Sequence, residues 1–195
     1  IYGDIYDDSM WLIDLVENLL SVTRIEEGRM QIRQSAELVD EVIKEALKHM
    51  GQSRTGRTIK VEEEDELILA KMDARLIVQV LINLIGNAVK YTPQGTDITV
   101  RVKKEKAENA ERSQVIISVC DLGNGIPDDR KERVFDMFYT GSDQVADSRR
   151  SLGLGLGLCR SIINAHGGKI WISDNIPHGA VVTFTLPAEE VALNE

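Results

Sequence analysis

The chain is poor in several of the residues and patterns that define major protein classes. It has only two cysteines, Cys120 and Cys159, which lie far apart in apolar surroundings, so we expect reduced core residues in a cytosolic protein and no disulfide framework. No apolar run approaches the roughly 20 residues of a membrane helix, and the opening residues lack a signal-peptide pattern. Basic residues number 23 against 32 acidic ones, a net charge of −9 without a basic stripe. Nucleic acid is therefore not an expected partner.

What the chain does have is enough apolar sequence for a substantial core. Its 195 residues are 43% hydrophobic, which suits one domain with an appendage or two small domains.

The stretch NLIGNAVKYTP predicts a helix in which Asn83, Asn87, Lys90 and Tyr91 share one face. On such a strip, an amide oxygen suits Mg²⁺, an ammonium group suits phosphate and a phenol ring suits a purine. The solvated side of any amphipathic helix has a similar pattern.

Two glycine-rich stretches follow. DLGNGIP, residues 121–127, comes after an apolar run that predicts a buried strand, and it places a carboxylate beside glycines that let a ligand approach the backbone. LGLGLGLCRSII, residues 152–163, leads directly into a helical pattern, and free N–H groups at a helix start bind phosphate. Each cluster alone is more often a turn. Their order and joint presence indicate a nucleotide site.

These stretches together resemble the ATP-binding catalytic domain of sensor histidine kinases, in the superfamily shared with gyrase, Hsp90 and MutL. The matching boxes are the N box NLIGNAVKYTP (83–93), the first glycine box DLGNGIP (121–127), the F box RVFDMFY (133–139) and the second glycine box GLGLGL (153–158). The resemblance implies an α/β sandwich of the Bergerat type, with a mixed, mostly antiparallel sheet and helices on one face. It also implies binding of ATP and Mg²⁺.

The resemblance assigns a role to individual residues. Asn87 is similar to the Mg²⁺ ligand and Asn83 to a supporting polar group one turn earlier. Lys90 is similar to a phosphate contact, Tyr91 to a wall of the adenine pocket, and Asp121 to the acceptor of the adenine amino group. The remaining implied nucleotide contacts are Gly123, Gly125, Ile126, Phe138, Arg149, Arg150, Gly153, Leu154, Gly155, Leu156 and Gly157.

The polar segment 139–153 is expected to form a nucleotide lid, because it has little periodicity and lies between the F box and the second glycine box. Arg149 and Arg150 could reach the γ-phosphate when such a lid closes. A solvated pair of charges explains these two arginines equally well.

Residues 1–28 predict a separate helix of bundle or coiled-coil type that ends near Gly28. Its apolar heptad positions are Ile5, Leu12, Leu15, Leu19 and Val22. The segment resembles the second helix of the dimerisation and phosphotransfer hairpin. Its amino-acid sequence is similar to that of the same helix in the potassium-sensing Kdp-type kinases. The expected organisation is therefore a hairpin helix over 1–28 and an ATP-binding domain over 29–195.

The family's phosphoacceptor histidine, in an H-E-x-[RK]-x-P setting, has no counterpart here. The three histidines, His49, His166 and His178, are better explained as capping or turn residues. The resemblance thus implies kinase machinery without its own phosphoacceptor and without autophosphorylation.

Alternating short patterns predict the remaining elements. Strands are expected at 30–33, 58–63, 67–70, 96–103, 114–120, 169–173 and 180–186, and helices at 37–50 and from an N-cap at Asp73. We expect 58–63 to pair with 67–70, 96–103 with 114–120, and 169–173 with 180–186. One mixed sheet with helices on one face fits this order.

Three functions fit these observations. The first is the catalytic domain of a two-component sensor kinase, which moves the γ-phosphoryl group of ATP to a histidine and then to an aspartate of a response regulator. Its implied partners are a histidine-bearing hairpin of the same or a partner subunit, a receiver domain, and a second copy in a homodimer. Its implied setting is the cytoplasmic part of a membrane-anchored bacterial kinase, with potassium or osmotic sensing. The alternatives are a standalone ATPase of the gyrase, Hsp90 and MutL kind, and a nucleotide-binding module without catalysis.

Overall fold

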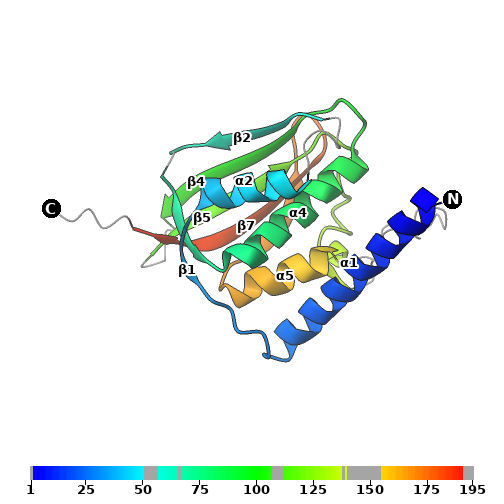
Figure 1. Cartoon of the computed structure of the whole chain (residues 1–195). Coiled ribbons are helices and arrows are strands. Elements are labelled where there is room, and N and C mark those ends of the chain that lie inside the picture. Colours follow the sequence, from blue (N-terminus) through cyan, green and yellow to red (C-terminus); the bar gives the residue numbers. More distant parts are fainter. Residues whose placement is uncertain are drawn as a thin grey trace.

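The computed structural model describes residues 2–50, 57–65, 67–106, 112–137, 139 and 155–190. A seven-stranded sheet and three helices on one of its faces form a sandwich, and a long N-terminal helix leans away from it (Figure 1). The elements in chain order are α1 (Tyr2–Glu26), β1 (Ser35–Leu38), α2 (Val39–Met50), β2 (Ile59–Glu63), β3 (Leu69–Met72), α4 (Ala74–Tyr91), β4 (Ile98–Lys106), β5 (Ser113–Cys120), η1 (Arg133–Phe135), α5 (Gly155–Ala165), β6 (Ile170–Asp174) and β7 (Ala180–Glu189).

The sheet is mixed and mostly antiparallel, which confirms the expected fold class. Its order is β1-β3-β7-β5-β4-β2, and β6 also pairs with β7. The predicted pairing of 96–103 with 114–120 is the antiparallel β4–β5 pair, and that of 169–173 with 180–186 is the β6–β7 pair. β7 is therefore central, because β5 lies along one of its sides while β6 and β3 pair with its first and last residues on the other.

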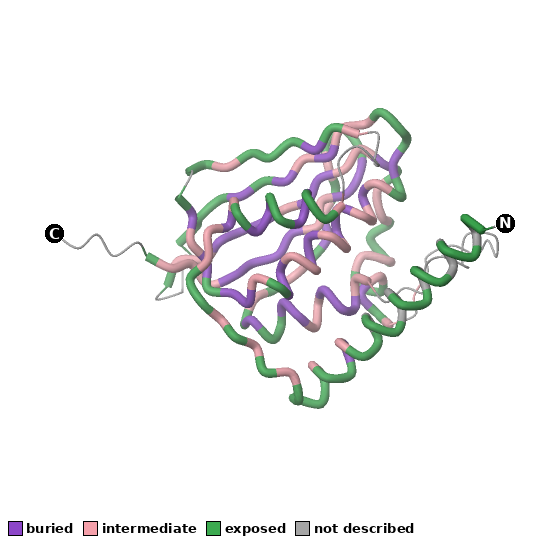
Figure 2. The backbone as a smooth tube through the Cα atoms, viewed as in Figure 1, coloured by how far each residue is buried: buried purple, intermediate pink, exposed green. Residues whose placement is uncertain are grey.

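The core lies between the sheet and helices α2, α4 and α5. These helices cover the same face, and the buried parts of the chain in Figure 2 lie in the strands and on the helix sides toward them. Helix α4 contacts both α2 and α5, and its apolar residues recur three and four positions apart, the spacing of one helix face. Its buried residues are Leu76, Ile77, Val80, Leu81, Leu84, Ile85 and Ala88.

Local sequence explains where α4 begins and ends. Asp73 occupies the N-cap in an extended conformation, as predicted, although its side chain makes no capping hydrogen bond. The helix ends at Tyr91 because Thr92 precedes Pro93, and a proline disfavours helical geometry in the residue before it. The polar strip therefore runs to the last turn of the helix.

Three predictions about the N-terminal half were wrong. Residues 30–33 are not a strand; Met30 and Ile32 pack against the core from a linker, and β1 begins at Ser35. The helix expected from residue 37 begins at Val39, because Glu37 and Leu38 pair with β3. Strands β2 and β3 do not pair with each other: β2 pairs in parallel with β4, and β3 pairs with β1 and β7.

Helix α1 ends at a glycine, as the sequence predicts. Gly28 has a φ of 66°, its N–H donates to the carbonyl of Ile25 at 3.1 Å, and the N–H of Arg29 donates to that of Arg24 at 2.9 Å. This is the hydrogen-bond pattern of a Schellman motif. The motif favours glycine at the position of Gly28 because the backbone there has a positive φ.

Among the stripe residues of α1 whose side chains the structure describes, the one near the C-terminal end of the helix is buried and the others are exposed. Val22 is 2% exposed, whereas Ile5, Leu12 and Leu19 are 58%, 52% and 42% exposed. The N-terminal end lies clear of the sandwich, while the other end approaches α5 (Figure 1). Among the described residues, no helix is both long enough and apolar enough to span a membrane.

Candidate functional site

The predicted polar strip is present on α4. Asn83 and Asn87 are half-buried, and the strip ends in the exposed residues Lys90 and Tyr91. The ammonium nitrogen of Lys90 lies 5.1 Å from the centroid of the Tyr91 ring, which places the two side chains against each other. The predicted apolar residues Leu81, Leu84 and Ile85 are buried. The helix therefore presents two amides, a cation and an aromatic ring on one strip, whose last two residues are exposed.

The second glycine box lies against this strip. A Cβ on Gly155, the first residue of α5, would be in ordinary van der Waals contact with Oδ1 of Asn83, at 3.6 Å. The amide nitrogen Nδ2 of Asn83 is buried, and the side chain lies beside the thiol of Cys159. Cys159, one turn along α5, is fully buried as predicted for a reduced core residue, and burial raises the pKa of its thiol to about 12. The fold thus brings the start of α5 to the amide side of α4.

Gly157 and Leu156 sit where α5 meets the F box. A Cβ on Gly157 would lie 2.9 Å from Sδ of Met137 and 3.1 Å from the carbonyl oxygen of Phe135. Leu156 also packs against the cluster that contains Phe135. Glycine at position 157 therefore permits the close packing of η1 on α5. Its expected contact with phosphate stays a prediction.

A cleft of about 640 Å³ opens where the end of α1 meets η1 and α5. Its walls include Glu26, Phe135, Met137, Gly157 and Arg160. None of its lining residues belongs to the first glycine box, so this cleft is not the predicted base site.

The first glycine box holds Asp121 in a fixed orientation. Oδ1 of Asp121 accepts hydrogen bonds from the backbone N–H of Gly123 at 2.9 Å and from that of Ala180 at 3.1 Å. The N–H of Asp121 donates to the carbonyl of Ala180 at 2.9 Å. Oδ2 has no hydrogen bond to any residue that the structure describes. One carboxylate oxygen therefore serves the turn, and the other is available as an acceptor.

Close backbone approaches bring this box to the end of α4. A Cβ on Gly123 would lie 3.0 Å from the carbonyl oxygen of Tyr91 and 3.1 Å from Cγ2 of Thr92. Gly125 has a φ of 71° and passes next to the carbonyl of Gly179, and Ile126 packs on the Phe135 cluster. The residues proposed for base recognition, Asp121 and Tyr91, are thus brought to the same region.

The sequence did not reveal that the turn between β6 and β7 also contacts Asp121. Nδ2 of Asn175 donates to the carbonyl of Asp121 at 2.7 Å, and Nδ1 of His178 donates to the carbonyl of Gly123 at 3.0 Å. The sequence identified this turn only as a hairpin connection. Asn175 and Asp121 are 54 positions apart, and no local pattern reports a contact at that separation.

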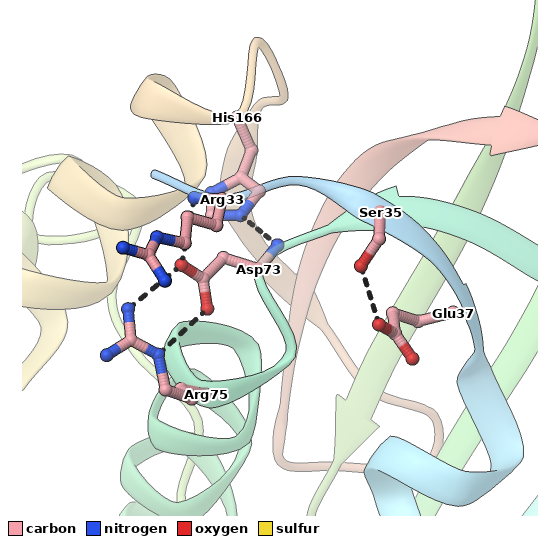
Figure 3. A network of polar contacts seen from close by, with 6 residues as sticks. All are labelled: Arg33, Ser35, Glu37, Asp73, Arg75 and His166. Atoms are coloured by element: carbon pink, nitrogen blue, oxygen red, sulfur yellow. Dashed lines mark hydrogen bonds and ion pairs between the residues drawn. The ribbon is translucent and has the colours of Figure 1, made fainter. Parts of the chain in front are cut away.

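His166 is a structural residue, which agrees with its assignment to the end of a helix. It is 3% exposed; Nδ1 donates to the carbonyl of Ile162 at 2.7 Å, and Nε2 accepts the N–H of Asp73 at 3.0 Å (Figure 3). This arrangement requires the neutral ring with its proton on Nδ1. Burial lowers the pKa of His166, although the bond to Ile162 and the charge of Asp73 oppose that shift.

The carboxylate of Asp73 joins two segments, the linker after α1 and the start of α4. Oδ2 accepts the N–H of Arg33 at 3.2 Å and a guanidinium N–H of Arg75 at 3.1 Å, so the linker from α1 is bonded to the start of α4 (Figure 3). Burial raises the pKa of Asp73, but the hydrogen bonds from Arg75 and Arg33 outweigh it and leave the pKa below its ordinary value. The fold therefore stabilises the ionised form of the Asp73 carboxylate.

The remaining predicted site residues belong to the F box, the expected lid and the start of the second glycine box. Phe138, Arg149, Arg150, Gly153 and Leu154 lie outside the described residues, as does the expected lid apart from Tyr139. The guanidinium of Arg133 lies 5.2 Å from the centroid of the Tyr139 ring. Among the described residues, no three histidine, cysteine or acidic side chains are grouped to hold a metal ion.

Comparisons with known proteins support the resemblance of the four boxes. A family described as "Histidine kinase-, DNA gyrase B-, and HSP90-like ATPase" matches residues 72–190. The sensor protein KdpD of Clostridium acetobutylicum is 41% identical over 97% of this chain, which spans 20% of that protein. The catalytic domain of histidine kinase ThkA has 30% identity and a TM-score of 0.67, covering 80% of this chain and 95% of that one. ThkA in complex with response regulator protein TrrA has 27% identity and a TM-score of 0.68, covering 91% and 49%.

Proposed function

Since the chain belongs to the histidine kinase-, DNA gyrase B- and HSP90-like ATPase family, we propose that it is the ATP-binding catalytic part of a sensor histidine kinase. The observation that carries this proposal is that both glycine boxes lie against the N box. The fold brings the amide strip of α4, the free acceptor of Asp121 and the glycine start of α5 to neighbouring positions. These are groups suited to a metal, a base and a phosphate chain, respectively.

In the proposed complex, Asp121 and Tyr91 recognise the base. Oδ2 of Asp121, ionised, accepts a hydrogen bond from the amino group at C6 of adenine and disfavours the carbonyl that guanine has there. Tyr91 forms a wall of the base site from the last turn of α4. Lys90 and the N–H groups at the start of α5 face the phosphates. Each of these roles follows from the family resemblance and is compatible with the geometry.

The residues also fit a single Mg²⁺ ion. The amide of Asn87 is half-buried on the same strip, and it forms no hydrogen bond with the described residues. Its oxygen suits an ion that keeps most of its waters and phosphate ligands, which matches the lack of an acidic cluster in the described part of the chain. When bound, Mg²⁺ neutralises phosphate charge. The chain itself orients the nucleotide and excludes alternative poses.

The proposed reaction moves the γ-phosphoryl group of ATP to a histidine nitrogen on a hairpin helix and then to an aspartate of a response regulator. The solved complex of ThkA with TrrA supports a receiver domain as partner. The likeness to KdpD over most of this chain supports a Kdp-type kinase with potassium or osmotic sensing, acting at the cytoplasmic side of a membrane. Because the chain spans a fifth of KdpD, we propose these properties for the whole protein of which such a domain is part.

None of the chain's histidines stands in the H-E-x-[RK]-x-P setting of the phosphoacceptor. Both ring nitrogens of His166 are bonded and buried, Nδ1 of His178 is bonded to Gly123, and His49 pairs with Glu45 on α2. We therefore expect phosphate to reach a separate hairpin and not the chain itself.

Labelled ATP tests this directly. The chain is incubated with Mg²⁺ and labelled ATP, alone and with a separate hairpin polypeptide that carries the phosphoacceptor histidine. Acid-labile, histidine-linked phosphate should appear on the hairpin only. A hairpin in which that histidine is replaced by glutamine is the control. Label on His49, His166 or His178, or none on the hairpin although ATP is bound, would contradict the proposal.

A standalone ATPase is not supported. Enzymes of the gyrase and Hsp90 kind typically have a glutamate where Asn83 stands, and this glutamate activates water. An amide cannot act as that general base.

A further inference from the structure

Asp121 is held more firmly than a turn residue requires, and part of that restraint comes from outside its own loop. The neighbouring turn, residues 175–179, joins β6 to β7 and lies against the backbone of Asp121. A Cβ on Gly179, whose φ is 110°, would be 2.0 Å from the carbonyl oxygen of Asp121. No other residue fits there, so this turn and the first glycine box pack as one unit.

The amide of Asn175 makes one of the polar contacts between the two loops. Its Oδ1 accepts the N–H of Ile176 at 2.9 Å, and this bond fixes which end of the amide faces Asp121. Its Nδ2 then donates to the carbonyl of Asp121 at 2.7 Å. The N–H of Asn175 also donates to the carbonyl of Gly179 at 3.0 Å. The side chain thus has one orientation and one polar partner in the site.

Every polar group of Asp121 except one is now accounted for. Its N–H is bonded to Ala180, its carbonyl to Asn175, and Oδ1 to the N–H groups of Gly123 and Ala180. These bonds fix the peptide planes on both sides of Asp121 and the torsion of its carboxylate. Oδ2 is consequently aimed in one direction before any ligand arrives, and preorganised acceptors discriminate better than mobile ones.

We infer that Asn175 is a positioning residue for base selection, which acts through the backbone of Asp121 and does not itself touch the nucleotide. The inference rests on the proposal that Asp121 accepts the amino group of the base. A loss of the Asn175 bond lets the Asp121 peptide rotate, so the direction of Oδ2 is no longer set. His178 supports the same loop two residues further on, through the carbonyl of Gly123.

The test measures the contribution of one substituent of the base. Dissociation constants are determined with Mg²⁺ for ATP and for purine riboside 5′-triphosphate, which lacks the amino group. The ratio used is the dissociation constant for purine riboside triphosphate divided by that for ATP, and it cancels effects on the phosphates. Asn175→Asp keeps the acceptor for Ile176 but turns a donor facing Asp121 into an acceptor. This variant should lower the wild-type ratio at least about fivefold, with affinity for purine riboside triphosphate changed less than about twofold.

Three further variants make the result decisive. Asn175→Ala removes the same donor without adding charge and should lower the ratio as well, which covers the case in which Asn175→Asp does not fold. Gln94→Glu adds one negative charge at an exposed position after α4 and should leave the ratio unchanged. Asp121→Asn is the reference. If Asp121→Asn leaves the ratio unchanged, the proposed base site is wrong. A second outcome is that Asp121→Asn changes the ratio while both Asn175 variants keep the wild-type ratio, even if they bind both ligands more weakly to the same extent. In that case only the role of Asn175 is refuted.

Discussion

Nε2 of His166 accepts the backbone N–H of Asp73 at 3.0 Å, which joins the end of α5 to the start of α4. Both helices carry parts of the proposed nucleotide site at their opposite ends: α4 ends in Lys90 and Tyr91, and α5 begins at Gly155. The bond therefore fixes the relative position of two site elements from a point remote from the site.

This bond predicts a loss of stability at mildly acidic pH. The ordinary pKa of His166 is 6.5, and the fold lowers it. Because the unfolded chain then binds more protons, stability falls as pH drops below about 6.5, by at most about 1.4 kcal/mol per pH unit, until the folded pKa is reached. Urea unfolding at a series of pH values from 7.5 to 5 should show this slope, and His166→Ala should reduce it.

The same substitution should lower stability at neutral pH by about 1 to 3 kcal/mol, since it leaves the buried N–H of Asp73 without its acceptor. His49→Ala, at an exposed position on α2, is the matched control and should retain both the stability and the slope. A slope identical in wild type and His166→Ala would show that other groups cause the acid sensitivity.

Asp121→Asn should do more than weaken ATP binding. The N–H groups of Gly123 and Ala180 both require an acceptor at the Oδ1 position, so the new amide has to place its NH₂ group where Oδ2 was. A donor there suits the carbonyl of guanine and opposes the amino group of adenine. We expect the ATP preference of about tenfold or more to be narrowed or reversed. Titration of both proteins with ATP and GTP measures it, and an unaltered preference would place the base elsewhere.

Asn87→Ala should separate metal binding from helix packing. If the amide oxygen is a Mg²⁺ ligand, nucleotide affinity in Mg²⁺ should fall about tenfold or more, while the weaker affinity in EDTA changes little. Calorimetric titration with ADP under both conditions provides the measurement. Equal losses in the two conditions would assign Asn87 to packing.

Two substitutions on α1 should distinguish association from folding. Leu12 is 52% exposed on an apolar stripe, so Leu12→Glu should reduce weak self-association without a change in unfolding free energy. Val22 is 2% exposed, so Val22→Ala should cost about 1 to 3 kcal/mol of stability. Sedimentation and urea unfolding give the two readouts. A tight, symmetric dimer that survives Leu12→Glu would contradict this account of the stripe.

The sequence by itself determined the family, the α4 strip and most elements. It could do so because these features are local: a helix face repeats every three or four residues, and a glycine box occupies consecutive positions. The spacing of Asn83 and Asn87, the turn at Gly28 and the N-cap at Asp73 are all readable over a few residues.

Only the tertiary structure decided which strands pair and what supports the site. Strand β2 pairs in parallel with β4 and not with β3, because strand partners are selected by burial across the whole sheet and not by the turn between neighbours. The bonds from Asn175 to Asp121 and from His166 to Asp73 span 54 and 93 positions. A backbone carbonyl or N–H has no sequence signature, so contacts to these groups emerge only when packing brings distant segments within hydrogen-bond distance.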